Sequence, residues 1–312
     1  MLIPRRAVLT AAGAVALVGC TSSPVVEGEP AVPPTPPPPT QAPEVTAAVS
    51  ALVALSAELT RAAGLAAWQD GDWARAAAAQ CQTHAALFAL PDPLAGGEQD
   101  PFPLPTPSPG TATDEKSVAT GLTERARVAT DALESAAAAA TSPDLRLAWA
   151  SAATAAYGLA GRRVTPVAGD AAPRRFASPT REAALAVALS HAWALVYGLG
   201  VGVGRLGSKD KLREWGVGRL NAAKELRNEL RSALGADTPA QPAAFVLPTA
   251  MDSVATITAG WAELELNLLD GFAAAVAAED SPRWRELMRA QTAPVARLGA
   301  PLPSWPGWVA AN

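Results

Sequence analysis

The sequence has very few of the side chains that carry most enzyme chemistry. Its 312 residues include two histidines, His84 and His191, and two cysteines, Cys20 and Cys81. Histidine is the commonest general acid or base, and no Cys-x-x-Cys pair, serine nucleophile elbow or glycine-rich phosphate loop occurs to replace it. The sequence therefore offers few side chains that could carry hydrolytic or redox catalysis, and we expect no cofactor.

A strong charge of either sign is also missing. Lys and Arg number 25 against 29 Asp and Glu, which gives a net charge of −4, and the two signs are interspersed. No basic stripe could follow a phosphate backbone, so nucleic acid is not an expected partner. Runs of β-branched residues are scarce and alanine is abundant, which predicts an all-α protein. A chain of this length could hold two domains of ordinary size.

Residues 1–19 have the pattern of an export signal. A short positive region ends in paired arginines, Arg5 and Arg6, and is followed by an apolar run from Ala7 to Val18. This run is too short to cross a bilayer permanently, so a plain membrane anchor is less favoured than a cleaved signal peptide. The paired arginines resemble a twin-arginine signal, although Pro4 stands where that pattern usually has Ser or Thr, and both export routes stay open.

The apolar run ends in Leu-Val-Gly-Cys at residues 17–20, which resembles the lipobox of bacterial lipoproteins. In such proteins the thiol of the cysteine receives a diacylglycerol before the signal is cleaved. Cys20 is therefore the predicted lipidation site, and the outer face of the cell membrane is the predicted location. Cys81 is then left without a disulfide partner, and a small buried side chain is favoured over a reactive thiol near His84.

A proline-rich segment follows the predicted lipidation site. Residues 20–43 include the run PPTPPPPT, which favours an extended polyproline conformation and cannot bury a core. At about 3 Å per residue, this predicted stalk would hold the folded part away from the membrane.

Apolar residues at spacings of three and four predict helices along most of the remaining chain. Asp72 is the predicted N-cap of the second helix and Pro91 its stop, while Ser142 and Pro143 mark the start of the fourth. The predicted helices span residues 44–67, 73–90, 114–140, 143–159, 180–206, 209–234, 249–278 and 282–298.

Two long crossovers, 91–110 and 235–248, and the linker 162–179 divide these helices into pairs. Two short hairpins joined by one longer crossover have the connectivity of a ferritin-like bundle. The predicted fold class is therefore all-α, with two tandem ferritin-like four-helix bundles after the lipoprotein signal and the Pro-rich stalk. The predicted parts are a first bundle at 44–161, a linker at 162–179, a second bundle at 180–300 and a Pro/Trp tail at 301–312.

An internal repeat supports the two-bundle prediction. Ser117–Trp149 and Ser253–Leu298 both open with Ser-Val-Ala-Thr and later carry Ser-Pro before an Arg-containing amphipathic run. The copies are 136 residues apart at the first match (117 to 253) and 139 at the second (142 to 281). One short insertion explains the change in offset from 136 to 139 residues, and duplication of a unit explains why the two segments are similar.

Several motifs of the second half are those of a known family. They are Val196–Val201, Ala236–Pro239, Phe245–Pro248, Leu264–Glu265, Phe272 and Leu302–Gly307. With these motifs, residues 180–312 resemble the actinobacterial ferritin-like domain of unknown function DUF4439, which implies a four-helix ferritin-like fold on exported lipoproteins and no established activity. The family usually has Glu-His shortly before its Val-Tyr-Gly run, whereas this chain has Ala192 and Trp193 there.

A ferritin-like di-metal site needs a carboxylate from each of two helices and a Glu-x-x-His pair from each of the other two. On a helical wheel, Glu265 lies within the apolar stripe of its helix, and Glu182 lies on the apolar face of helix 180–206. No Glu-x-x-His occurs in the chain, and the corresponding inward positions hold Arg219 and Gln291. We therefore expect no metal-binding residues here.

The inward charges have a structural interpretation. An unpaired charge in a core costs several kcal/mol, so we expect Arg219 to neutralise Glu265 or Glu182 where an ancestral site held metal. His191 is expected to be solvent-facing or lightly buried. In the first bundle the candidate acids are Glu58, Glu124 and Glu134, and the only imidazole is that of His84. We expect these side chains to lie on amphipathic helix surfaces rather than to bind a metal.

Small and aromatic side chains are expected to serve packing. Trp305 and Trp308, in the proline-rich tail, are expected to cap an open bundle end rather than form a ligand platform. Close approach of neighbouring helices is expected at four glycines: Gly200, Gly202, Gly204 and Gly207.

These observations favour an exported, membrane-anchored lipoprotein whose bundles act as a non-catalytic structural or interaction module of the cell envelope. Its expected partners are the membrane, through the N-terminal lipid, and an unidentified envelope protein. Two alternatives stay open: a ferritin-like metal-binding oxidoreductase with a degenerate site, and a carrier of an apolar ligand. Metal content separates the first alternative from the favoured function, and a large apolar pocket between helices would favour the second.

Overall fold

The computed structural model describes residues 40–308, except 109, 163 and 168–171. The predicted signal peptide, Cys20, residues 20–39 of the stalk and residues 309–312 of the tail therefore lie outside the described residues. The chain divides into two units, Met1–Thr40 and Gln41–Asn312. Except for Thr40, all described residues belong to the second unit.

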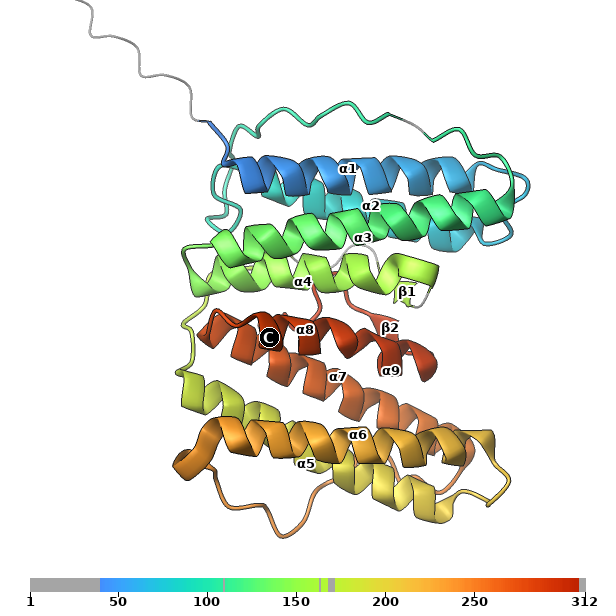
Figure 1. Cartoon of the computed structure of the whole chain (residues 1–312), viewed down its shortest axis with the longest axis vertical. Coiled ribbons are helices and arrows are strands. Elements are labelled where there is room, and N and C mark those ends of the chain that lie inside the picture. The colour runs from blue at the N-terminus through green and yellow to red at the C-terminus, as the bar shows by residue number, and fades with distance from the viewer. Residues whose placement is uncertain (1–39, 109, 163, 168–171, 309–312) are drawn as a thin grey trace, which may run out of the picture. The chain divides into compact units, whose positions relative to one another are not determined.

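The described residues are mostly helical, which confirms the all-α prediction (Figure 1). Two short 3-10 turns occur at Ala160–Arg162 and Gly235–Asp237, and one parallel pair of two-residue strands joins β1 (Thr165–Pro166) to β2 (Pro301–Leu302). The helices are α1 (Pro43–Ala63), α2 (Gly71–Phe88), α3 (Glu115–Ala139), α4 (Pro143–Leu159), α5 (Arg181–Arg205), α6 (Lys211–Leu234), α7 (Val254–Ala278), α8 (Pro282–Ala290) and α9 (Thr292–Arg297).

Local capping explains where several helices begin. The side chain of Ser142 accepts a hydrogen bond from the backbone N–H of Leu145 at 3.3 Å, and Pro143 occupies the first helical position of α4, as predicted. The predicted N-cap Asp72 is wrong, because Asp70 accepts the N–H of Trp73 at 3.4 Å and α2 already begins at the residue after it.

The last predicted helix, 282–298, is divided into α8 and α9 at Gln291. Pro294 accounts for the break. It has no N–H to donate to the carbonyl of Ala290, and its ring crowds that carbonyl, so an unbroken helix cannot pass through this position.

Each half of the unit has the same connectivity. In the first half α1 packs against both α2 and α3, and α4 packs against α3; in the second half α5 packs against both α6 and α7, and α8 packs against α7. The crossover between α2 and α3 runs along the length of α1 (Figure 1). Each half is thus a hairpin, a long crossover and a second hairpin.

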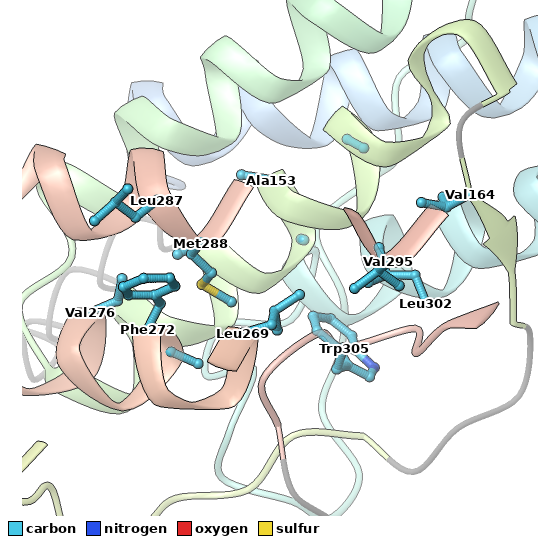
Figure 2. Packing of buried hydrophobic residues seen from close by; sticks show 14 of the residues in the cluster. Ala153, Val164, Leu269, Phe272, Val276, Leu287, Met288, Val295, Leu302 and Trp305 are labelled. Atoms are coloured by element: carbon cyan, nitrogen blue, oxygen red, sulfur yellow. The ribbon is translucent and has the colours of Figure 1, made fainter. Parts of the chain in front are cut away.

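Helix α4 joins the two halves. It packs against α3 on one side and against α7, α8 and α9 on the other, and nearly all of its residues from Leu147 to Leu159 are buried. Alanine is the commonest of these residues, so the neighbouring backbones can approach closely. Figure 2 shows the apolar cluster at this junction, with Leu269 and Phe272 of α7 and Leu287 and Met288 of α8.

The tail was predicted to cap an open bundle end, but it packs at the junction, against α2 and α4 of the first half and α7 and α8 of the second. Trp305 is only 2% exposed, with its ring 4.3 Å from that of His84 and 5.8 Å from that of Phe88. The hydroxyl of Ser151 on α4 donates to the carbonyl of Pro306 at 2.8 Å. Trp308 is half-buried against Phe176. Helical periodicity holds no information about a non-helical segment, which is why the sequence did not indicate this course.

Among the described residues, α1 and α5 are long and apolar enough to cross a membrane. About half of each helix is buried against its neighbours, as in the core helix of a folded bundle. Length and composition alone therefore do not distinguish a spanning helix from a core helix here.

Candidate functional site

The second half contains a fully buried carboxylate. Glu265 lies on the face of α7 that also carries Trp261, Leu268 and Phe272, and all four side chains have an exposed fraction of 0%. The apolar stripe of α7 packs this face into the core, and the charged side chain of Glu265 is buried because its neighbours on the stripe are hydrophobic. It is the only charged residue on that stripe.

Arg219 of α6 neutralises this carboxylate. Its Nε and Nη2 atoms donate to the two carboxylate oxygens of Glu265, each at 2.7 Å, in a bidentate pair. The Arg219 side chain is 12% exposed, so one edge reaches the surface. There it lines an open hollow of about 700 Å³ together with Trp215 and Arg297.

Gln291 completes the cluster from the break between α8 and α9. Its amide oxygen accepts from Nη2 of Arg219 at 3.1 Å, and its amide nitrogen donates to the backbone carbonyl of Glu265 at 3.1 Å. The same nitrogen also donates to the carboxylate of Glu265. Helices α6, α7 and α8 are thus joined by one closed set of hydrogen bonds.

Both carboxylate oxygens of Glu265 accept hydrogen bonds within the cluster, and the adjacent guanidinium stays protonated at all ordinary pH values. Removing one member of such a pair leaves an uncompensated buried charge, which costs about 3–5 kcal/mol. The arrangement can therefore hold three helices in register.

Glu182 does not join this cluster. It lies in the first turn of α5 and is exposed, so its prediction as an inward charge is wrong. The helical wheel placed Glu182 on the face of Leu185 and Leu189, which are buried, but the Glu182 side chain is exposed to solvent.

The first half has its own buried carboxylate, Glu58 of α1, which is 3% exposed. Arg61 donates to it from Nε at 3.3 Å and also from Nη2, the N–H of Gly110 donates at 3.1 Å, and Arg125 lies 3.9 Å away. Burial alone would raise the pKa of Glu58, but Arg61, Gly110 and Arg125 together outweigh it and hold the pKa below its ordinary value. The expected helix-surface setting is therefore wrong for Glu58.

Glu134 and Glu124 of α3 have opposite surroundings. Glu124 is exposed and pairs with Arg127, as expected for a helix surface. Glu134 faces the second half, where Arg285 of α8 donates to it at 3.0 Å and Arg289 pairs with its other oxygen. This ion pair crosses between the two halves, and no pattern within a single helix could have identified it.

The two histidines have different surroundings. His84 is 1% exposed, and its Nε2 lies 2.7 Å from the carbonyl oxygen of Ser304. Burial lowers the pKa of His84 to about 4, although the Ser304 contact opposes the shift. His191 is half-buried beside Gly271, and burial lowers its pKa as well.

Burial also shifts the pKa of Cys81 and of Asp270. Burial raises the pKa of the Cys81 thiol to about 12, so it is unreactive at neutral pH. Burial raises the pKa of Asp270 on α7 to about 6. In the part of the chain that the structure describes, no group of three or more His, Cys, Asp or Glu side chains is placed to hold a metal ion.

Helical-wheel reasoning located Arg219, Glu265 and Gln291 but missed the tail contacts of His84 and the contact of Glu134 across the two halves. The first three lie on helices whose apolar stripes are clear in the sequence. The others depend on how separate segments pack, for which one sequence carries no signal.

No protein-family model, curated protein or solved structure matches this chain. The DUF4439 resemblance of residues 180–312 stays a prediction that rests on the motifs quoted for it.

Proposed function

We propose that this protein is an exported lipoprotein, anchored to the outer face of the cell membrane through Cys20. Its two helical halves are ferritin-like bundles that act as a non-catalytic structural or interaction module of the cell envelope. The observation that carries the non-catalytic part of the proposal is the closed cluster of Arg219, Glu265 and Gln291. In a ferritin-like bundle these core positions would hold metal ligands, whereas here a guanidinium and an amide satisfy the carboxylate.

The connectivity of both halves supports the ferritin-like assignment. A hairpin, a crossover along the bundle and a second hairpin occur twice, with α1 and α5 in corresponding positions. The Ser-Pro pair that starts α4 recurs at the start of α8, which supports a duplication. The envelope location is supported by the signal and lipobox patterns of residues 1–20.

Lipidation is tested by metabolic labelling of cells that express the full chain with an alkyne analogue of palmitate. We expect label on the wild-type protein and on Cys81→Ser, and none on Cys20→Ser. Cys20→Ser should also move from the membrane fraction to the soluble fraction. Equal labelling of Cys20→Ser and the wild type would contradict the anchor.

The non-catalytic assignment is tested by metal analysis of the full-length protein after dialysis. We expect no stoichiometric iron or manganese, because Arg219 occupies the hydrogen-bonding positions of the Glu265 carboxylate. One or two equivalents of retained iron or manganese would instead favour a metal-binding oxidoreductase. Arg219→Met provides a second measurement, since a latent site would gain metal once the guanidinium is removed.

A further inference from the structure

The open hollow beside Arg219 has the size of a binding site. Its volume is about 700 Å³, within the range of about 300–1,000 Å³ that is usual for small-molecule sites. Two small residues of α6, Gly218 and Ala222, line it, and a Cβ atom added at Gly218 would meet nothing within 4 Å. Open space therefore lies at Gly218, the neighbour of Arg219 in the sequence.

Arg219 has hydrogen-bond donors that no part of the cluster uses. Its Nε and Nη2 atoms donate to Glu265 at 2.7 Å, and Nη2 also donates to Gln291 at 3.1 Å. Because a guanidinium is planar and its Nε and Nη2 edge faces the carboxylate, Nη1 points away from Glu265. The Nη1 atom is accessible to solvent and donates to none of the described residues. Two N–H groups of a fixed guanidinium are therefore available to an acceptor in the hollow.

The charges around the hollow favour a ligand with a single negative charge. Glu265 already neutralises Arg219, which leaves the cations of Lys211 and Arg297 against the carboxylate of Glu214. None of these last three side chains forms an ion pair with another described residue. Two free cations and one free acid give the described lining a net charge of +1, whereas the whole chain carries −4. One anionic group balances this charge, and Glu214 would repel a second.

Trp215 gives the hollow an apolar surface. Its side chain is half-buried, and its ring lies 5.8 Å from that of the fully buried Trp261 at an interplanar angle of 43°. This contact with a core residue holds the Trp215 ring in place, so little ordering is needed when a ligand binds. A flat apolar group can pack against such a ring by offset stacking. The hollow therefore offers both donors for an anion and a surface for a ring.

We propose that this hollow binds a small molecule with one carboxylate attached to a flat apolar ring. The carboxylate accepts hydrogen bonds from Nη1 of Arg219 and is attracted by Lys211 and Arg297, while the ring packs against Trp215. Hydrogen bonds between a guanidinium and a carboxylate are charge-assisted, so they add orientation as well as affinity. The site contains no residue of the predicted lipid anchor, and the proposal depends neither on Cys20 nor on the envelope function.

The test is photolabelling of the full-length protein with 4-benzoylbenzoate, which carries one carboxylate on a photoreactive diaryl ketone. We expect label on peptides that cover residues 211–222 or 292–297, located by mass spectrometry. Gly218→Leu fills the hollow and should reduce this label about tenfold. Gly204→Leu, at an exposed position of α5 outside the hollow where a Cβ also meets nothing within 4 Å, should leave it unchanged. Equal labelling of these two variants, or label spread along the whole chain, would overturn the proposal.

Two comparisons test the chemistry of the ligand. 4-Benzoylbenzamide has nearly the same shape without the charge and should label the wild type about tenfold less, because the charge-assisted bond to Arg219 is lost. Lys211→Ala combined with Arg297→Ala should reduce labelling by the carboxylate about threefold, since exposed charges contribute less. Lys224→Ala, exposed on α6 outside the hollow, should leave it unchanged. Equal labelling by the amide and the acid, or stronger labelling by the corresponding phosphonate dianion, would show that the single-carboxylate assignment is wrong.

Discussion

His84 is the residue at which the tail is attached to the first half. Its ring packs against that of Trp305 at an interplanar angle of 52°, and its Nε2 contacts the backbone of Ser304 in a site that is closed to solvent. Burial lowers its pKa to about 4 from an ordinary value of 6.5. The folded protein therefore holds this side chain neutral over a pH range in which the unfolded chain protonates it.

The stability of the protein should consequently fall as the pH falls from about 6.5 to about 4. The unfolded state binds a proton at His84 in this range and the folded state does not, so protonation favours unfolding. A shift of this size corresponds to about 3 kcal/mol at pH 4. Above pH 6.5 the effect is absent.

Chemical denaturation of the wild type and of His84→Gln, at several pH values between 7 and 4, measures this effect. Glutamine can still donate to Ser304 but does not titrate, so the difference in unfolding free energy between the two proteins should change with pH in this window. Other titrating groups, such as Asp270, are common to both proteins, so their contributions cancel in the difference in unfolding free energy. A constant difference would show that His84 does not titrate on unfolding.

At the scale of a single element, α5 shows how glycine permits a large side chain to be buried. Trp261 of α7 is fully buried, and its indole N–H donates to the carbonyl of Gly198 at 2.9 Å. A Cβ atom added at Gly202 would lie 2.5 Å from the Trp261 ring, and one at Gly216 of α6 would lie equally close. The four-glycine prediction is therefore correct for Gly202 but wrong for the other three, where a Cβ would meet nothing within 4 Å.

Gly202→Ala should destabilise the protein by about 1–3 kcal/mol, because the added methyl group overpacks the Trp261 site. Gly200→Ala is the matched control two residues away. It meets nothing and improves helix propensity, so it should stabilise the protein by about 0.5–1 kcal/mol. Thermal unfolding measures both. Equal effects of the two substitutions would mean that Trp261 is not packed against Gly202.

The helices themselves were predictable because their signals are local. Ser142 and Pro143 gave the start of α4, and the apolar stripes gave the faces of α6 and α7 that carry Arg219 and Glu265. The tail was not predictable, because His84 and Ser304 are separated by 220 residues and no local pattern relates them. The direction assigned to Glu182 was wrong for a similar reason, since a helical wheel gives the angle of a residue around the helix axis and not which neighbouring segments cover it.

On the scale of the whole unit 41–312, charged groups as well as alanines join the two halves. Arg285 is 5% exposed and donates to Glu134 of α3, while Arg146 of α4 donates to the carbonyls of Val276 and Ala277 at the end of α7. Cationic side chains satisfy the unpaired carbonyls at a helix C-terminus and complement its dipole. The junction between the two halves therefore contains specific polar contacts in addition to its apolar cluster.

Glu134→Gln should destabilise the folded unit by about 1–3 kcal/mol, because it removes the carboxylate that Arg285 and Arg289 share, while Arg285 keeps its ion pair with Asp280. Glu124→Gln on the same helix removes an exposed partner of Arg127 and should leave stability close to that of the wild type. Denaturant titration with a probe in each half measures the result. A loss confined to the second half would show that the two halves unfold separately.

The course of the tail also bears on how the protein is made. His84 and Phe88 are covered by Ser304 and Trp305, and His84 and Ser304 lie 220 residues apart in the sequence. Contacts between residues so distant in sequence form late, since the intervening chain must first be ordered. The first half therefore cannot complete its core until residues 304 and 305 have left the ribosome, and a protein truncated before residue 301 would have an exposed aromatic surface that chaperones and proteases can recognise.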